Sequence, residues 1–141
     1  AASNSTKTPS TTSTTTATSR PGVMLLDCGA AATNVVIVSS NAVFLSCYEQ
    51  GGEDLTTILA RSEKQTHADA EKLKRDLAKA TRPSVVIDGL EQKMAESRQR
   101  LNKIIKIAKD QNLKCNVIQT WCTGGGGLCH GWVRNVLLNE K

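Results

Sequence analysis

Three short apolar runs open the patterned part of the chain and predict neighbouring β-strands. The runs at residues 23–26, 35–38 and 43–45 are separated by turn-forming residues, which is typical of a three-stranded meander. The first two runs are apolar at every position, whereas a strand with one solvated face alternates between apolar and polar residues. The pattern therefore predicts a sheet that helices cover on both faces.

Helical periodicity follows the strand runs. Gly51 and Gly52 end the strand pattern, and Glu53 and Asp54 then place negative charge where the first turn of a helix favours it. A second helix is predicted from residue 66 to about residue 80, and residues 66–83 are interpreted as a possible small helical subdomain, because a proline at position 83 limits further extension.

The last part of the pattern predicts a long helix, a fourth strand and a short final helix. The apolar positions of the long helix recur at spacings of three, four and seven, over about 20 residues. They are Leu90, Met94, Leu101, Ile104, Ile105 and Ala108. Residues 115–121 alternate as a strand does, 124–127 form a glycine loop, and 128–138 carry the last helix. The expected fold class is α/β, with a mixed sheet.

The first 22 residues differ in composition from the rest of the chain. They contain 13 Ser or Thr and no acidic, aromatic or large aliphatic residue, so they offer nothing to offset the entropy of ordering. We expect residues 1–22 to be a disordered tether and 23–141 to be one folded domain. The longest apolar runs fall far short of the roughly 20 residues that a membrane helix needs, so no membrane span is expected.

Charge and cysteine content change this picture little. The formal net charge is +5, but residues 61–114 hold 14 of the 18 Lys and Arg together with 8 of the 13 Asp and Glu, which is typical of solvated helix faces. Aromatic residues are only 3%, so we expect no nucleic-acid partner. Cys115, Cys122, Cys129 and His130 suggest a zinc site, but their spacing matches no compact zinc motif, and reduced core thiols are favoured.

Candidate chemistry lies in the glycine turns. Asp27, Gly29 and Thr33 follow the first strand as one carboxylate, one glycine and one hydroxyl. Backbone N–H groups around a glycine bind phosphate oxygens, and a carboxylate holds the accompanying Mg²⁺, usually through water. A plain hairpin with a polar tip is the alternative interpretation. Neither this loop nor the other glycine turns match the P-loop or dinucleotide-binding templates.

The order of these motifs resembles the second lobe of actin-like ATPases, which have a ribonuclease H-like fold. The matching pieces are Asp27-x-Gly29-x-x-x-Thr33-Asn34, then Gly51-Gly52-Glu53-Asp54, then Glu71-x-x-Lys74 and the glycines that begin at residue 124. Within that superfamily the chain is most similar to the PilM-like proteins of type IV pilus assembly. The Gly-Gly-Glu-Asp and Glu-x-x-Lys pieces are also similar to those of heat-shock chaperone ATPase domains. The resemblance covers about residues 23–138.

The resemblance implies roles for individual residues. Asp27 is expected to orient Mg²⁺ through water. The phosphates are expected at Gly29, Thr33 and Asn34, and the adenosine at Glu71, Lys74, Gly124, Gly125 and Gly126. A surface ion pair is the alternative interpretation of Glu71 and Lys74. No residue is assigned as a general base, so hydrolysis stays open.

The resemblance also implies a function: a nucleotide-facing lobe of a PilM-like ATP-binding protein, with ATP and Mg²⁺ as cofactors. Its partners would be other pilus assembly proteins at the inner membrane, and its location cytoplasmic, including peripheral association with that membrane. The sequence holds no second Asp-x-Gly loop, so we expect the chain alone to bind ATP poorly, because one lobe does not enclose the triphosphate. The alternatives are a non-catalytic interaction module, or a lobe of a chaperone-like or sugar-kinase-like ATPase.

Overall fold

The computed structural model describes residues 20–111, 113 and 115–138 and has one four-stranded sheet. Its strands are β1 (Arg20–Cys28), β2 (Thr33–Ser39), β3 (Val43–Tyr48) and β4 (Cys115–Thr123). They lie in the order β3-β2-β1-β4; β1, β2 and β3 form an antiparallel meander, and β1 and β4 are parallel. The predicted mixed α/β sheet with an opening meander is confirmed.

The start of the sheet differs from the prediction. Residues 20–22, which the composition assigned to the tether, are the first residues of β1: Gly22 pairs with Ser39, and Arg20 pairs with Cys115. Pairing on both sides extends the strand because it uses backbone groups, whatever the side chains are. The rest of the predicted tether, residues 1–19, lies outside the described residues.

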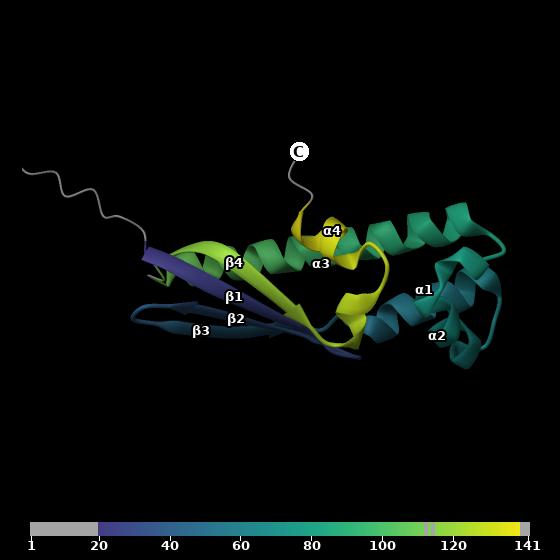
Figure 1. Cartoon of the computed structure of the whole chain (residues 1–141), viewed down its shortest axis with the longest axis horizontal. Coiled ribbons are helices and arrows are strands. Elements are labelled where there is room, and N and C mark those ends of the chain that lie inside the picture. Colours follow the sequence, from purple (N-terminus) through teal and green to yellow (C-terminus); the bar gives the residue numbers. More distant parts are fainter. Residues whose placement is uncertain (1–19, 112, 114, 139–141) are drawn as a thin grey trace, which may run out of the picture.

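Helices α1 (Gly52–Glu63) and α2 (His67–Arg75) lie together at one end of the molecule, beyond the carboxyl end of β1 (Figure 1). The predicted second helix is shorter than expected: it ends at Arg75, and a short 3-10 turn, η1 (Leu77–Lys79), follows it. Residues 66–83 thus form a short helical segment that connects α1 to the long helix. Helix α2 of this segment packs against α1.

The long helix, α3 (Pro83–Asp110), starts earlier than its apolar repeat indicated. Proline suits the first helical position because its N–H group would have no helical partner there. Glu63, at the end of α1, accepts hydrogen bonds from the backbone N–H groups of Thr81 (2.8 Å) and Arg82 (2.9 Å). This carboxylate therefore joins the end of α1 to the start of α3, so the two ends of the segment that carries α2 are held together.

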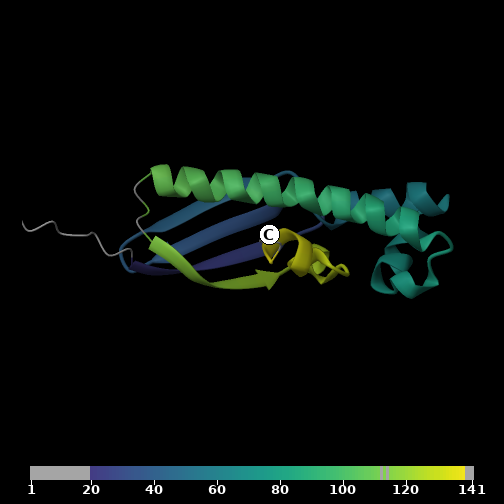
Figure 2. The same ribbon diagram turned by 90° about the horizontal axis from the view of Figure 1, so that it is seen from above.

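The apolar stripe of α3 packs along the sheet (Figure 2). Of the predicted apolar positions, Leu90, Met94, Leu101, Ile104 and Ala108 are buried. The hydroxyls of Tyr48 and Ser97 lie 2.7 Å apart and join β3 to α3 inside this layer. The predicted glycine loop contains a 3-10 turn, η2 (Gly125–Leu128), and the predicted last helix is shorter than expected: it is α4 (Trp132–Leu137), which packs beside α3.

The prediction that helices cover both faces of the sheet is wrong for the part of the chain that the structure describes. In Figure 1, α3 and α4 lie on one face of the sheet, and the opposite face carries no helix. Burial alternates along β1: Met24, Leu26 and Cys28 are buried, whereas Leu25 between them is exposed. An apolar run shows that both faces are apolar, but not what covers each of them.

Candidate nucleotide site

Three glycine turns meet at the carboxyl end of β1. The N–H groups of Gly52 and Glu53, at the start of α1, donate to the carbonyls of Gly29 (2.9 Å) and Ala30 (2.8 Å). A Cβ atom on Gly126 would lie 2.8 Å from the amide nitrogen of Gly52 and 3.0 Å from the carbonyl oxygen of Gly29, which no real side chain tolerates. The backbones of all three turns are thus in direct contact, and the glycines make that approach sterically possible.

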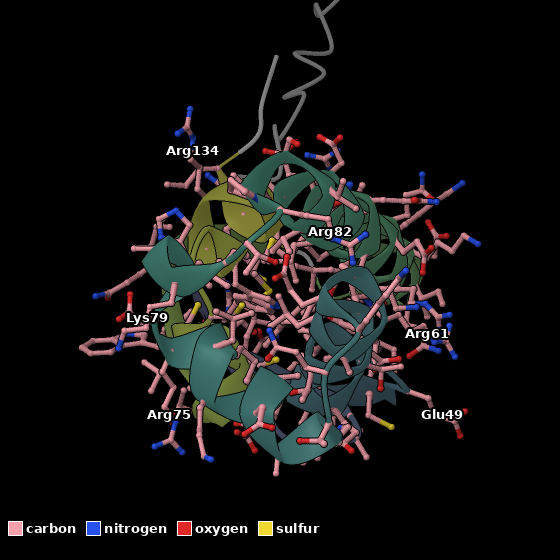
Figure 3. All side chains as sticks on the ribbon, turned by 90° about the vertical axis from the view of Figure 1, so that its right-hand side faces the viewer. Glu49, Arg61, Arg75, Lys79, Arg82 and Arg134 are labelled. Atoms are coloured by element: carbon pink, nitrogen blue, oxygen red, sulfur yellow. The ribbon has the colours of Figure 1, made fainter. Side chains whose placement is uncertain are left out.

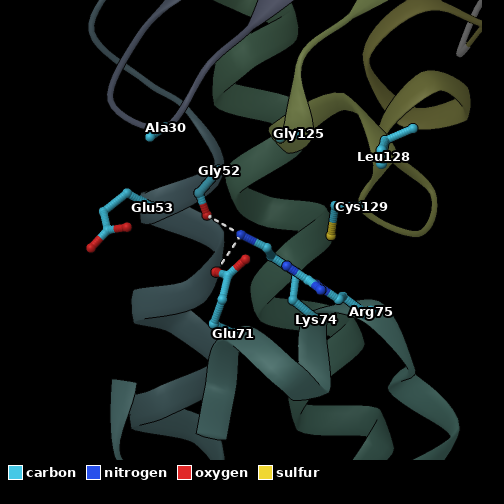
Figure 4. Close-up of a pocket in the computed structure, with 10 residues that line it drawn as sticks. Ala30, Gly52, Glu53, Glu71, Lys74, Arg75, Gly125, Leu128 and Cys129 are labelled. Carbon is cyan, nitrogen blue, oxygen red and sulfur yellow. Dashed lines mark hydrogen bonds and ion pairs between the residues drawn. The ribbon is translucent and has the colours of Figure 1, made fainter. Parts of the chain in front are cut away.

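A cavity of about 600 Å³ opens beside these turns (Figure 4). Its lining comes from the β1–β2 turn, the start of α1, the carboxyl half of α2 and η2. The lining residues are Ala30, Gly52, Glu53, Glu71, Lys74, Arg75, Gly125, Gly126, Leu128 and Cys129. The hairpin tip near residue 30 and the glycine bend near residue 125 therefore open onto one cavity.

Lys74 is the most heavily bonded side chain of this cavity. Its ammonium group donates to Glu71 Oε2 (2.7 Å), Thr56 Oγ1 (2.8 Å) and the carbonyl of Gly52 (3.2 Å), and only 10% of the side chain is exposed. These bonds tie α2 to the first turn of α1, where the glycine turns meet. The interpretation of Glu71 and Lys74 as a plain surface pair does not fit, because the ammonium group is enclosed.

The carboxylate of Glu71 stays charged in this network. Burial raises the pKa of Glu71, but the hydrogen bonds from Lys74 and Thr56 outweigh this effect, and its pKa is lowered overall. Cys129 on the opposite wall behaves differently, because burial raises the pKa of its thiol to about 11. At neutral pH the cavity therefore presents a Glu–Lys pair on one wall and a neutral thiol on the other.

The predicted site residues fall into two groups. Glu71, Lys74, Gly125 and Gly126 line the cavity together, although they come from segments some fifty residues apart in sequence. Gly124 does not line it. This glycine has a φ of +85° and packs against the end of β1, where a Cβ atom would lie 2.7 Å from Asp27 Oδ1. Gly124 therefore allows the glycine bend to pack against the end of β1 and does not line the cavity itself.

The residues predicted to bind phosphate, Gly29, Thr33 and Asn34, do not line the cavity but lie beside it. The hydroxyl of Thr33 is fully buried and donates to the carbonyl of Gln50 (2.8 Å), so it supports the turn before α1 and does not meet the predicted role of direct phosphate contact. The N–H group of Gly29 donates to Ala32 and closes a tight turn. Asn34 Nδ2 lies 3.4 Å from Asp27 Oδ2, which orients that carboxylate at the end of β1.

The sequence interpretation missed several lining residues, of which Arg75 is the most notable. It directly follows Lys74 on α2 and, seen from the α1–α2 end, points outward from the molecule (Figure 3). Its position next to the Glu-x-x-Lys motif was the only signal available. Leu128, which also lines the cavity, is largely exposed. A guanidinium and a leucine are groups against which a planar, partly polar molecule such as a purine can pack.

Comparison with known proteins shows the fold. No protein-family model matches the chain, and no curated protein sequence does. Solved structures do match, and three of these matches each cover 84% of this chain. The PilM–PilN type IV pilus biogenesis complex matches with a TM-score of 0.67 at 22% identity over 34% of its own chain. Ethanolamine utilization protein EutJ from Carboxydothermus hydrogenoformans matches with a TM-score of 0.59 at 18% identity over 40% of its chain.

A third match, to Bacillus thuringiensis ParM in apo form, has a TM-score of 0.53 at 13% identity over 37% of that chain. The described part of the chain therefore has the fold of an actin-like ATPase lobe. Of these three structures, the one of PilM has the highest TM-score. The chain spans about a third to two fifths of the length of the chains that it matches.

Proposed function

We propose that this chain is the nucleotide-facing lobe of a PilM-like, actin-like ATP-binding protein. One observation carries the proposal: the cavity brings the Glu71–Lys74 pair and the glycines at 125 and 126 together beside the β1–β2 turn. A polar pair on a helix and a stretch of bare backbone suit the two ends of a nucleoside phosphate. The resemblance of the motifs and the fold of the matching structures both support this choice over a generic pocket.

The residues present fit ATP and Mg²⁺ in part. At position 125 a Cβ atom would meet nothing within 4 Å, so the backbone there is open to a ligand. Asp27 supplies a carboxylate oxygen, the kind of ligand that Mg²⁺ prefers, at the edge of the same turn cluster. When bound, the metal neutralises phosphate charge, while Glu71, Lys74 and Arg75 hold the nucleoside end in place.

A role in type IV pilus assembly at the inner membrane is the finer part of this proposal. It is supported by the motif order and by the likeness to the structure of a PilM–PilN complex. In such a role the lobe changes its contacts with assembly partners according to the bound nucleotide. None of the helices in the described ranges is long and apolar enough to cross a bilayer.

The proposal predicts weak but specific binding of Mg-ATP. Isothermal titration calorimetry of the chain is expected to give a Kd on the order of 1 mM, because one lobe leaves the triphosphate largely solvated. Gly125→Leu is expected to abolish the heat, since the new side chain enters the cavity without a backbone clash. Gly127→Ala is the control, because residue 127 does not line the cavity and a Cβ atom there makes only ordinary contact.

Absence of heat from the unmodified chain at millimolar Mg-ATP would leave the non-catalytic interaction module as the better reading of this lobe. Equal binding by Gly125→Leu and the unmodified chain would show that the nucleotide binds elsewhere.

A further inference from the structure

The face of the sheet opposite α3 carries two rows of apolar side chains. Residues that pair across neighbouring strands project from the same face. One row runs across the sheet as Leu45, Val36, Leu25 and Trp121; the next runs as Val43, Val38 and Val23. Ile118 adds to them beside the irregularity between β1 and β4. These eight side chains are called the outer face below.

The outer face is open in the part of the chain that the structure describes. Leu45 is 71% exposed and Trp121 is 59% exposed, and both lie on edge strands. Asp27 is the only charged side chain among the outward positions of the four strands; it belongs to a polar row at one end that also holds Asn34 and Cys47. The largest contiguous apolar patch on a protein surface is often an interaction site.

The size of the outer face fits association with an identical surface. From the exposed fractions of the large side chains, it offers on the order of 500 Å² of accessible apolar area. Two copies packed face to face would bury on the order of 1,000 Å² in total, which reaches the lower limit of specific protein interfaces. Apolar sheets pack in this way at a separation of about 10 Å.

Charge does not oppose such a pairing. The chain has a formal net charge of +5, but exposed cations such as Arg100, Lys103 and Lys106 lie on α3, on the other side of the sheet. A two-fold axis across the strands would set the two sheets antiparallel and place the two Asp27 carboxylates at opposite ends. No residue of the outer face lines the nucleotide cavity, so both cavities would stay open.

We propose that the outer face is an interface between two copies of this chain, packed sheet against sheet about a two-fold axis. The apolar runs that predicted a sheet covered on both faces are then satisfied by α3 on one side and by the second copy on the other. Residues 1–19 are a poorer match for this face, because they contain no large aliphatic or aromatic side chain.

The test uses the full chain and its own tryptophans. Trp121 lies on the outer face, whereas Trp132 is only 3% exposed and already buried against α3. Sedimentation equilibrium from about 1 to about 100 μM is expected to show a monomer–dimer equilibrium, as is usual for interfaces of this size. Over the same range the Trp121 emission is expected to shift to shorter wavelength as the ring leaves water.

Two matched variants locate the interface. Leu45→Lys places a charge at the most exposed apolar position of the outer face and is expected to raise the dimer Kd at least about 30-fold and to abolish the emission shift. Ile107→Lys is the control, because Ile107 is 47% exposed but lies on α3, away from the outer face, and it should dimerise normally. If Leu45→Lys loses its circular dichroism signal, Val43→Lys replaces it.

Three results would overturn the proposal. One is a chain that stays monomeric throughout the range, which would mean that a second copy does not cover the outer face. Another is open-ended aggregation instead of a defined dimer. The third is a Leu45→Lys variant that dimerises as well as the unmodified chain.

Discussion

Gly124→Ala is expected to lower the free energy of unfolding by at least about 3 kcal/mol, whereas Gly125→Ala is expected to leave it unchanged or slightly higher. The two glycines are neighbours in the same bend, but their surroundings differ. At Gly124 the backbone has a φ of +85°, which costs a residue with a side chain about 1–2 kcal/mol. At Gly125 there is nothing within 4 Å of the added atom.

Steric overlap adds to the backbone cost at Gly124. The added Cβ atom would lie 2.6 Å from the carbonyl carbon of Cys28 and 2.7 Å from Asp27 Oδ1. Cys28 is buried at the end of β1, which lies between β2 and β4, so its backbone cannot easily move away. The glycine bend must therefore shift outward, away from the turns at residues 30 and 52 that it contacts.

Urea denaturation followed by circular dichroism measures both variants, and the shift in midpoint at constant slope gives the change in stability. Equal midpoints for Gly124→Ala and the unmodified chain would mean that the bend does not pack against β1 as described. A large loss for Gly125→Ala would contradict the open space at that position.

Lys74→Met is expected to weaken Mg-ATP binding at least about tenfold and to lower the free energy of unfolding by about 1–2 kcal/mol, because it removes charge-assisted hydrogen bonds to Glu71 and Thr56. Lys72→Met is the matched control. Lys72 lies two residues away on the same helix, but it is 79% exposed, pairs with Asp69 and does not line the cavity. Both binding and stability should therefore be unchanged.

The stability effect of Lys74→Met should depend on pH. Lys74 helps to hold the pKa of Glu71 below its usual value in the folded state, so Glu71 contributes stability above its unfolded pKa. That contribution is lost as the pH falls through the lowered pKa of the folded state. The difference between the unmodified chain and Lys74→Met is therefore expected to be largest near neutral pH and to shrink in acid. A difference that stays constant down to strongly acidic pH would contradict the link between Lys74 and Glu71.

The sequence predicted the elements well where periodicity was strong. The meander followed from apolar runs separated by turns, and the buried stripe of α3 followed from its spacing. The start of α3 at Pro83 was less visible, because the first turn of that helix is fixed by Glu63, a residue twenty positions earlier. A contact of that kind is tertiary and leaves no periodic signal.

The site was predictable as a set of turns but not as a set of contacts. Residue types at Gly29 and Thr33 suggested phosphate binding, yet a sequence does not show which groups are already bonded. The Thr33 hydroxyl is committed to Gln50, and the glycines at 124 and 126 serve close backbone packing. Arg75 was missed because a single arginine on a charged helix is indistinguishable from a solvated one until the cavity beside it is known.

The packing on the two faces of the sheet shows another limit of prediction from the hydrophobic pattern. Apolar residues at successive positions of β1 and β2 correctly indicated that both faces of the sheet are apolar. They could not indicate that α3 and α4 lie on the same face and leave Leu25 and Trp121 open within the described residues. An apolar strand face predicts that another element packs against it, but this element need not belong to the same domain.

In the proposed function, the hairpin tip near residue 30 and the glycine bend near residue 125 form one binding cavity for a nucleotide. The most direct test is a titration of the ¹⁵N-labelled chain with Mg-ATP, followed by two-dimensional NMR of the backbone amides. Saturable shifts are expected at Ala30, Gly125 and Gly126, together with Lys74 and Arg75 on α2. Shifts that instead gather on exposed lysines of α3, or that are absent from both turns, would contradict it.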